Sequence, residues 1–229
     1  MKGKSDLREL DPSTGRVETK YPIQPKFFGE GLTAVDNHLI QLTWKSKKGF
    51  TYDMDDLTKD PVEFEFSTTR NQGWGLTYDP VNDELIESDG SANLHFWDPK
   101  TMKQTRRVDV TRLDGTPASQ INELEFWRGR VLANIWYKDI IIVINPLTGV
   151  VEKEYGRPYY FVSCSSAALC FAVNNLLISA LFISDFQHLW PQKERTRHGA
   201  DVLNGISISE DPNILYVTGK NWDRMFKLK

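Results

Sequence analysis

Four turns headed by Asp or Asn recur along the chain at a nearly constant spacing. They begin at Asp11, Asp53, Asp98 and Asn145, so the steps between them are 42, 45 and 47 residues. A period in the forties, with several short strands in each period, is the signature of a β-propeller, in which each repeat forms one blade. The sequence therefore predicts an all-β chain whose similar sheets are arranged around a centre.

Each repeat is opened by a short motif rich in glycine or polar residues. These motifs are Gly29-Glu30-Gly31, Gly73-Trp74-Gly75, Asn122-Glu123-Leu124-Glu125 and Asn204-Gly205. Each stands just before an expected strand, and the Gly-Glu-Gly motif has the composition of a turn. In a radial arrangement the openings meet at the centre. We therefore expect a site there that draws one or two residues from each repeat.

Alternation of apolar and polar residues places the strands within the repeats. The expected strands are 7–10, 16–20, 76–78, 84–88, 93–97, 104–110, 123–127, 130–136, 140–144, 150–154, 205–209, 214–218 and 224–228. The charged residues of 104–110 suit an exposed sheet edge. We expect a single domain that spans 1–229.

Two places break the repeat. The chain begins within a unit, which leaves a partial first blade at 5–20. The last turn, at Asn145, lies 82 residues before its matching point near Lys227, so about 35 residues are extra. The apolar segment at about 157–187 is the expected insertion. Part of it, 172–182, fits a short buried helix, and its length argues against a membrane span.

Composition excludes several classes of function. The formal net charge is −3, which provides no basic field for a nucleic acid. The two cysteines, Cys164 and Cys170, make neither a disulfide framework nor a zinc-binding pair, and the four histidines have no ligand spacing. His95 alternates with apolar residues and is interpreted as a strand side chain. The first six residues have no apolar run and are not a signal peptide.

The opening motifs and their neighbours form an ordered set. They read FFGEGLT, GWGLT, SDGS, INELE, NIW, DVLNGIS and TGKNW. Their order and spacing over 5–156 and 188–229 resemble the plant and bacterial type of glutaminyl cyclase (glutaminyl-peptide cyclotransferase). The resemblance implies a five-bladed β-propeller that converts an N-terminal glutamine into pyroglutamate and releases ammonia. It also suggests action in the secretory pathway.

Two departures from that family stand out. Its members begin with a blade that opens with a motif like Phe-Thr-Gln-Gly-Leu, whereas this chain begins after that point, and the substrate-contacting Gln of that motif is absent here. The apolar segment at 157–187 has no counterpart in the family. Our hypothesis is an alternative or mis-spliced product that lacks a first exon and retains an intron.

The resemblance also implies a set of site residues. Glu30 matches the family's glutamate in Gly-Glu-Gly-Leu, and a single carboxyl there would accept the proton of the amine and return it to the departing ammonia. Asn122 and Lys220 match polar partners that would stabilise the charge on the amide oxygen. Trp74 and Trp136 resemble aromatic walls that exclude water.

Other interpretations of these residues stay open. Gln72 fits either a substrate contact or a turn residue. Asn122 and, more so, Asn204 fit turn residues that bond to their own backbone. Without the resemblance, Glu30 and Lys220 would be interpreted as solvated loop residues. Trp74 and Trp136 would be assigned to packing between blades.

The sequence thus predicts an enzyme that acts on peptides or proteins with an N-terminal glutamine. We expect a monomer with no metal or other cofactor, and no nucleic-acid or membrane partner. The alternative is a non-catalytic propeller that serves as a binding platform, and a sugar- or polyol-binding propeller is a weaker third reading.

Overall fold

The structure, a computed structural model, describes residues 3, 5–11, 14–156, 186 and 189–228. Apart from one short helix and a single-residue helical position at Phe186, the regular elements in these residues are β-strands. The prediction of an all-β chain is therefore confirmed. The predicted insertion at about 157–187, with its expected helix and both cysteines, lies almost wholly outside the described residues.

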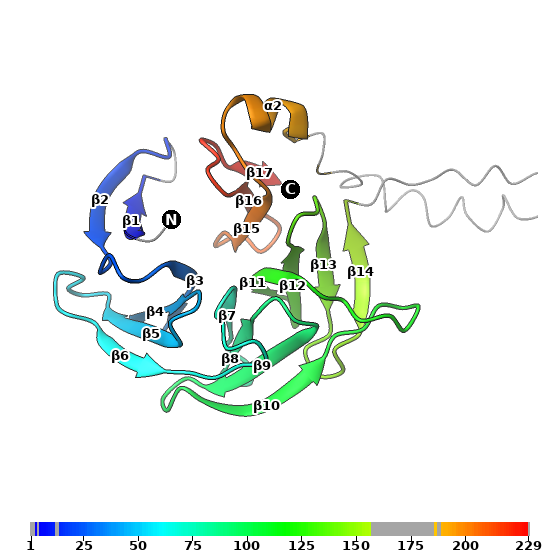
Figure 1. Cartoon of the computed structure of the whole chain (residues 1–229), viewed down its shortest axis with the longest axis horizontal. Helices are drawn as coiled ribbons and strands as arrows, with labels where there is room; N and C mark the ends of the chain where they lie inside the picture. Colours follow the sequence, from blue (N-terminus) through cyan, green and yellow to red (C-terminus); the bar gives the residue numbers. More distant parts are fainter. Residues whose placement is uncertain (1–2, 4, 12–13, 157–185, 187–188, 229) are drawn as a thin grey trace, which may run out of the picture.

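The described strands form five antiparallel sheets (Figure 1). The first has two strands, β1 (Asp6–Leu10) and β2 (Val17–Pro22). The second contains β3 (Gly29–Val35), β4 (His38–Thr43), β5 (Lys48–Asp53) and β6 (Val62–Glu65). The third contains β7 (Leu76–Asp79), β8 (Glu84–Ser88), β9 (Asn93–Asp98) and β10 (Lys103–Asp109).

The remaining two sheets complete the arrangement. The fourth contains β11 (Ile121–Trp127), β12 (Arg130–Ile135), β13 (Ile141–Ile144) and β14 (Val151–Tyr155). The fifth contains β15 (Leu203–Ile208), β16 (Leu215–Gly219) and β17 (Phe226–Leu228). The strands predicted from the sequence agree with these bounds to within about two residues, because turn residues fix where each strand stops.

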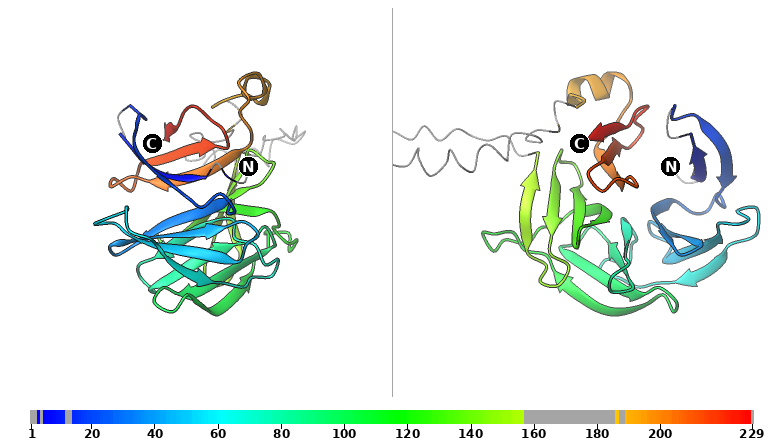
Figure 2. Two further views of the ribbon diagram at one scale, coloured as in Figure 1. Left: turned by 60° about the vertical axis from the view of Figure 1, so that its left-hand side comes forward. Right: turned by 180° about the vertical axis from the view of Figure 1, so that it is seen from behind.

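Within each sheet the strands follow one another in chain order. The first strands of the four larger sheets, β3, β7, β11 and β15, lie towards the centre, and each contacts the next (Figures 1 and 2). Four sheets are therefore arranged as the blades of a propeller. The two-stranded sheet β1–β2 lies beside β3–β6, where Leu7 packs against Phe50 and Tyr52.

Apolar clusters fill the space between neighbouring sheets. One lies between β3–β6 and β7–β10, one between β7–β10 and β11–β14, and one between β11–β14 and β15–β17. Residues such as Leu42, Leu85 and Ile142 are fully buried there. Each such side chain contributes about 1.5–3 kcal/mol to stability. These clusters fix the angle between sheets and thereby the positions of the central strand ends.

A short helix, α2 (Gln192–Arg197), joins the apolar segment to the last sheet. The Arg195 side chain is 5% exposed and donates two hydrogen bonds to the Asp139 carboxylate, at 2.8 and 2.6 Å. A Cβ on Gly156 would lie 2.9 Å from the Phe186 ring, so these two residues are in contact. The end of the fourth sheet and Phe186 therefore lie side by side.

Candidate functional site

The first strands of three sheets share a local irregularity near their beginnings. Two consecutive residues there face a single residue of the second strand, which defines a β-bulge. The bulged pairs are Glu30–Gly31 in β3, Asn122–Glu123 in β11 and Asn204–Gly205 in β15. A bulge bends the strand and redirects its side chains, and bulges are over-represented beside active sites.

The third sheet has a related arrangement just before β7. Trp74 N donates to the Ser88 carbonyl at 2.9 Å, and Ser88 N donates to the Gly75 carbonyl at 3.1 Å. Trp74 and Gly75 therefore both face Ser88. All four blades thus carry an extra residue at the same end of the first strand, and each of the opening motifs found in the sequence supplies it.

These irregular positions touch one another in chain order. Gly31 N donates to the Trp74 carbonyl at 2.7 Å, and a Cβ on Gly75 would overlap the Asn122 carbonyl oxygen. Asn204 Oδ1 in turn accepts a hydrogen bond from Glu123 N at 3.4 Å. The expectation that Gly-Glu-Gly forms a turn is wrong. Its residues lie inside β3, where glycine is needed for close approach of a neighbouring strand rather than for a positive φ.

An ion pair links the last blade to the β3–β6 blade. Lys220 directly follows β16, and its Nζ lies 3.7 Å from Glu30 Oε1. The Lys220 side chain is 31% exposed and the Glu30 side chain 12%. Lys220 N donates to the Val202 carbonyl at 3.0 Å, which fixes the backbone that carries the ammonium group.

The environment of Glu30 shifts its ionisation towards neutral pH. Burial raises the pKa of this carboxyl to about 7, although the Lys220 ammonium acts in the opposite direction. A pKa near the working pH is what a group that both accepts and returns a proton requires. At neutral pH, the Glu30 carboxyl can therefore both accept a proton and release it.

The two glutamates of the INELE motif also have raised pKa values, and the charge of Glu30 acts on one of them, Glu123. Burial, together with the charges of Glu30 and Glu125, raises the pKa of Glu123 to about 8. Burial also raises the pKa of Glu125 to about 7, partly offset by a 3.1 Å hydrogen bond from Ile208 N. Neither residue was predicted as part of the site.

The two asparagines differ in their surroundings. Asn122 is 2% exposed, and its side-chain Oδ1 has no hydrogen-bond partner among the described residues. An unpaired buried amide oxygen is costly, so it is a candidate for binding a donor of a ligand. In the part of the chain that the structure describes, Asn204 Oδ1 accepts its hydrogen bond from another blade, whereas one interpretation predicted a bond to its own backbone. It holds the β11 bulge through Glu123 N.

Aromatic side chains lie next to these bulges. The Trp74 and Trp136 rings meet edge to face, with 5.1 Å between their centroids. The Tyr137 ring stacks on Trp136, with 4.1 Å between the centroids. Gln72 Oε1 accepts a 3.1 Å hydrogen bond from Trp74 Nε1. Gln72 therefore orients the indole. A Cβ on Gly90 would lie 2.5 Å from the Trp74 ring, so the backbone there closes against the indole.

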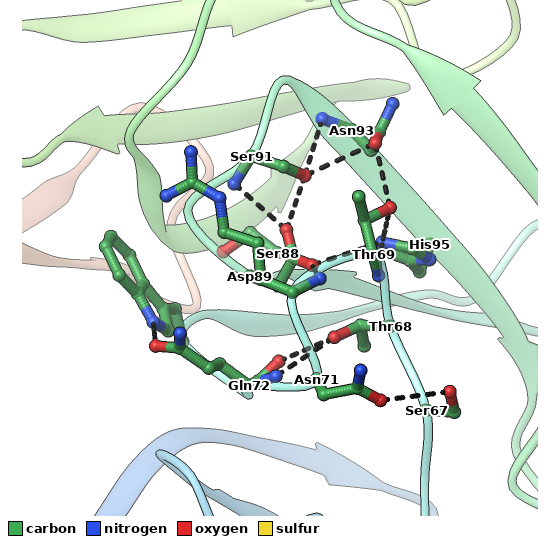
Figure 3. A network of polar contacts seen from close by, with 12 residues as sticks. Ser67, Thr68, Thr69, Asn71, Gln72, Ser88, Asp89, Ser91, Asn93 and His95 are labelled. Atoms are coloured by element: carbon green, nitrogen blue, oxygen red, sulfur yellow. Dashed lines mark hydrogen bonds and ion pairs between the residues drawn. The ribbon is translucent and has the colours of Figure 1, made fainter.

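A buried polar network anchors the loop that carries Gln72 (Figure 3). Asp89 accepts hydrogen bonds from Arg70 N at 2.5 Å and from Ser91 N at 2.9 Å, and it lies 3.7 Å from His95 Nε2. Burial raises the pKa of Asp89, but the hydrogen bonds from His95, Ser91 and Arg70 outweigh it and hold the pKa well below the usual range. His95 is a buried strand residue, as predicted.

The family model for glutamine cyclotransferase matches residues 1–156 and 181–229 of this sequence. The chain belongs to the glutamine cyclotransferase family. The matched ranges leave out 157–180, which is most of the segment predicted to have no counterpart in this family. The resemblance inferred from the seven motifs is confirmed.

Known members of the glutamine cyclotransferase family align over nearly the whole chain. A glutaminyl-peptide cyclotransferase of Arabidopsis thaliana is 34% identical over 227 residues, which make up 99% of this chain and 60% of the relative. The crystal structure of Myxococcus xanthus glutaminyl cyclase superposes with a TM-score of 0.71 at 28% identity, covering 99% of this chain and 82% of that one. This chain therefore spans about 60% of the length of its Arabidopsis relative.

A more distant structure shares the fold alone. Virginiamycin B lyase of Staphylococcus aureus matches with a TM-score of 0.52 at 12% identity, over 100% of this chain and 60% of that one.

Within the described residues of this glutamine cyclotransferase family member, no cluster of three or more His, Cys, Asp or Glu could hold a metal ion. In the same residues, no helix is long and apolar enough to cross a membrane.

Several residues that the resemblance to glutamine cyclotransferases singled out are neighbours in the structure. Glu30 and Lys220 form an ion pair, and Trp74 and Trp136 are in contact. Asn122 lies against Gly75, next to Trp74. Gln72 and Asn204 support neighbouring groups through the hydrogen bonds described above. The alternative of a solvated Glu30 is excluded, because the side chain is 12% exposed.

Proposed function

We propose that this protein is a glutaminyl-peptide cyclotransferase, which cyclises the N-terminal glutamine of peptides or proteins to pyroglutamate and releases ammonia. The observation that carries the proposal is the Glu30 carboxyl. It is nearly buried, paired with Lys220 at 3.7 Å and has a pKa of about 7. The names of the Arabidopsis and Myxococcus relatives support the same reaction.

The reaction joins two groups of one residue. The α-amine attacks the γ-carboxamide carbon, an N–C bond forms, and the bond to the amide nitrogen breaks. Because both groups already belong to one side chain and its backbone, the enzyme mainly selects a reactive conformer. Ionised Glu30 would accept the proton that the amine loses.

The carbonyl oxygen gains negative charge as the amine attacks. Lys220 is the cation of the site, and it would stabilise that oxygen when substrate draws it away from Glu30. A preorganised donor of this kind contributes about 2.7–4 kcal/mol to transition-state stabilisation. The unpaired Oδ1 of Asn122 would accept a hydrogen bond from the amine or from the amide nitrogen.

The remaining predicted residues would shape the pocket for the glutamine side chain. Trp74 and Trp136 would form an apolar wall that keeps water from the reacting carbonyl. Gln72 would set the orientation of the Trp74 indole, and Asn204 would hold the β11 backbone. We assign both to positioning rather than to direct contact with substrate.

We further infer that 1–229 is one domain and that β1–β2 belongs to a fifth blade. The two-stranded sheet has its own apolar contacts with the β3–β6 blade, which supports this count. The segment at about 157–187 would then be an insertion between the fourth and fifth sheets.

Ammonia release from a glutaminyl dipeptide tests the function. We expect wild-type activity and a loss of at least 100-fold in kcat in Glu30→Gln, because a positioned general base contributes about 10²–10⁴-fold. Glu9→Gln, at an exposed position, is the matched control. A folded wild-type protein without activity on any glutaminyl peptide would favour the binding platform instead.

A further inference from the structure

Glu123 occupies a position that the other blades give to glycine. The second residue of the irregular pair is Gly31, Gly75 or Gly205 in the other three blades, and a Cβ on any of these would collide with a neighbour. In β11 the same position carries a carboxylic acid. The strand has room for a side chain at this point of the ring, and the chain places an ionisable one there.

The backbone of Glu123 is held in place from two sides. Its N–H donates to Asn204 Oδ1 at 3.4 Å, and its Cα is packed against Gly75. Gly75 belongs to the blade that carries Trp74, and Asn204 to the blade that leads to Lys220. The Glu123 backbone therefore lies between the blade that carries Trp74 and the blade that leads to Lys220.

We propose that Glu123 is a second catalytic carboxyl, which donates a proton to the departing ammonia while Glu30 accepts one from the attacking amine. This inference rests on the proposed function. It assigns the two proton transfers, from the amine and to the departing ammonia, to two carboxyls instead of one.

The charges around the two glutamates divide the roles. The groups that act on Glu123 are Glu30 from β3, Glu125 from its own strand and Lys220 after β16. Glu30 has the ammonium group within 3.7 Å and is the carboxyl that ionises first. Burial, and after it the charge of Glu30, raise the pKa of Glu123 to about 8, so that its protonated form is favoured at neutral pH. The ion pair with Lys220 favours the ionised form of Glu30, and two carboxyls whose environments differ in this way are the usual sign of an acid and a base.

The step balances as follows. The α-nitrogen forms a bond to the carboxamide carbon (Cδ) of the glutamine side chain, and its surplus proton passes to Glu30. The bond from that carbon to the amide nitrogen breaks, and the nitrogen takes the Glu123 proton and leaves as NH₃. Glu30 is then protonated and Glu123 ionised, and transfer of one proton from Glu30 to Glu123 restores the starting state.

The experiment compares two substrates in Glu123→Gln. One is a glutaminyl dipeptide, whose amide nitrogen must be protonated to leave. The other is the matching dipeptide with an N-terminal glutamate γ-trifluoroethyl ester, whose alkoxide leaves with much less need of a proton. We expect kcat for the amide to fall about 10²–10⁴-fold and kcat for the ester, after subtraction of uncatalysed cyclisation, to fall less than 10-fold. Glu30→Gln should impair both, because both need the amine deprotonated.

Two controls separate this role from a structural one. Glu125→Gln removes the other carboxyl of the same strand and should affect both substrates alike. In wild type, kcat for the amide should fall above the pKa of Glu123, since a general acid must hold its proton, and Glu123→Gln should lose this decline.

Three results would overturn the inference. They are an unchanged kcat for the amide in Glu123→Gln, an equal loss on both substrates in a variant with native circular dichroism, or a wild-type profile without a decline that depends on Glu123. Should Glu123→Gln fail to fold, the wild-type pH profile and the ratio of amide to ester rates above pH 8 still decide, because an ionised Glu123 must slow the amide selectively. Failure of the proposed function would look different, since wild type itself would then release no ammonia.

Discussion

Removal of the Lys220 ammonium should shift the ionisation of Glu30 by an amount that the structure allows us to work out. Two unit charges 4 Å apart interact by about 4 kcal/mol at the effective dielectric constant of a protein surface. Nζ and Oε1 are 3.7 Å apart, and Lys220 is 31% exposed, so we halve this to about 2 kcal/mol to allow for solvent screening. That is roughly a 30-fold change in the protonation equilibrium of the carboxyl.

The direction follows from the charges. Lys220→Met keeps the burial that raises the pKa of Glu30 and removes the cation that lowers it, so the pKa rises above its value of about 7. At pH 7 the ionised fraction of Glu30 should fall from about half to roughly 3%, by the same 30-fold factor. The rate of any reaction that uses ionised Glu30 should fall in parallel.

Carbon-13 NMR titration of the glutamate carboxyl groups measures this directly. Glu30→Gln identifies the resonance of Glu30, and Lys227→Met, at an exposed position of β17, removes one positive charge from the same sheet as a control. The reasoning is refuted if the Glu30 midpoint is the same in Lys220→Met as in Lys227→Met.

Three other predictions concern stability and packing. Asp139→Ala leaves Arg195 buried without its carboxylate, which should cost about 3–5 kcal/mol and lower Tm by roughly 6–20 °C in calorimetry; an unchanged Tm would contradict it. Glu125 has its folded pKa raised to about 7, so its contribution to stability is lost as pH rises through 7. Glu125→Gln should therefore be more stable than wild type at pH 8, by about 1–3 kcal/mol, and equal to it near pH 4; equal urea midpoints at pH 8 would argue against burial as the cause. Gly75→Ala places a methyl group against the Asn122 carbonyl and should cost about 1–3 kcal/mol, whereas wild-type stability in urea would show that the two strands can move apart.

Much of the architecture follows from local sequence signals. The turns headed by Asp53, Asp98 and Asn145 fix where each strand ends, and alternation fixes which face is buried. The bulges could not be predicted in the same way. An extra residue in a strand becomes visible only when the pairing register is known, and glycines needed for close approach, as at Gly31, resemble turn glycines in a sequence.

The residues of the candidate site could be predicted only where they belong to motifs shared with the family. Glu30 and Lys220 were found through the family resemblance, and the structure joins them. Glu123 was missed because alternating glutamates on a strand normally face solvent. Its backbone is held by Asn204 of β15, some eighty residues further along the chain, and no local pattern predicts such a neighbour. The raised pKa of a strand glutamate is a property of the assembled sheets.

The ion pair between Glu30 and Lys220 also reports on a late step of folding. One group is contributed early in the chain and the other late, so a polypeptide whose final blade has not yet docked has an isolated carboxyl in place of an ion pair. The ion pair would then form in the same kinetic phase as the docking of the last blade. The time course of turnover during refolding would therefore show when the last blade docks. Spectroscopic signals from the earlier blades would not show this step.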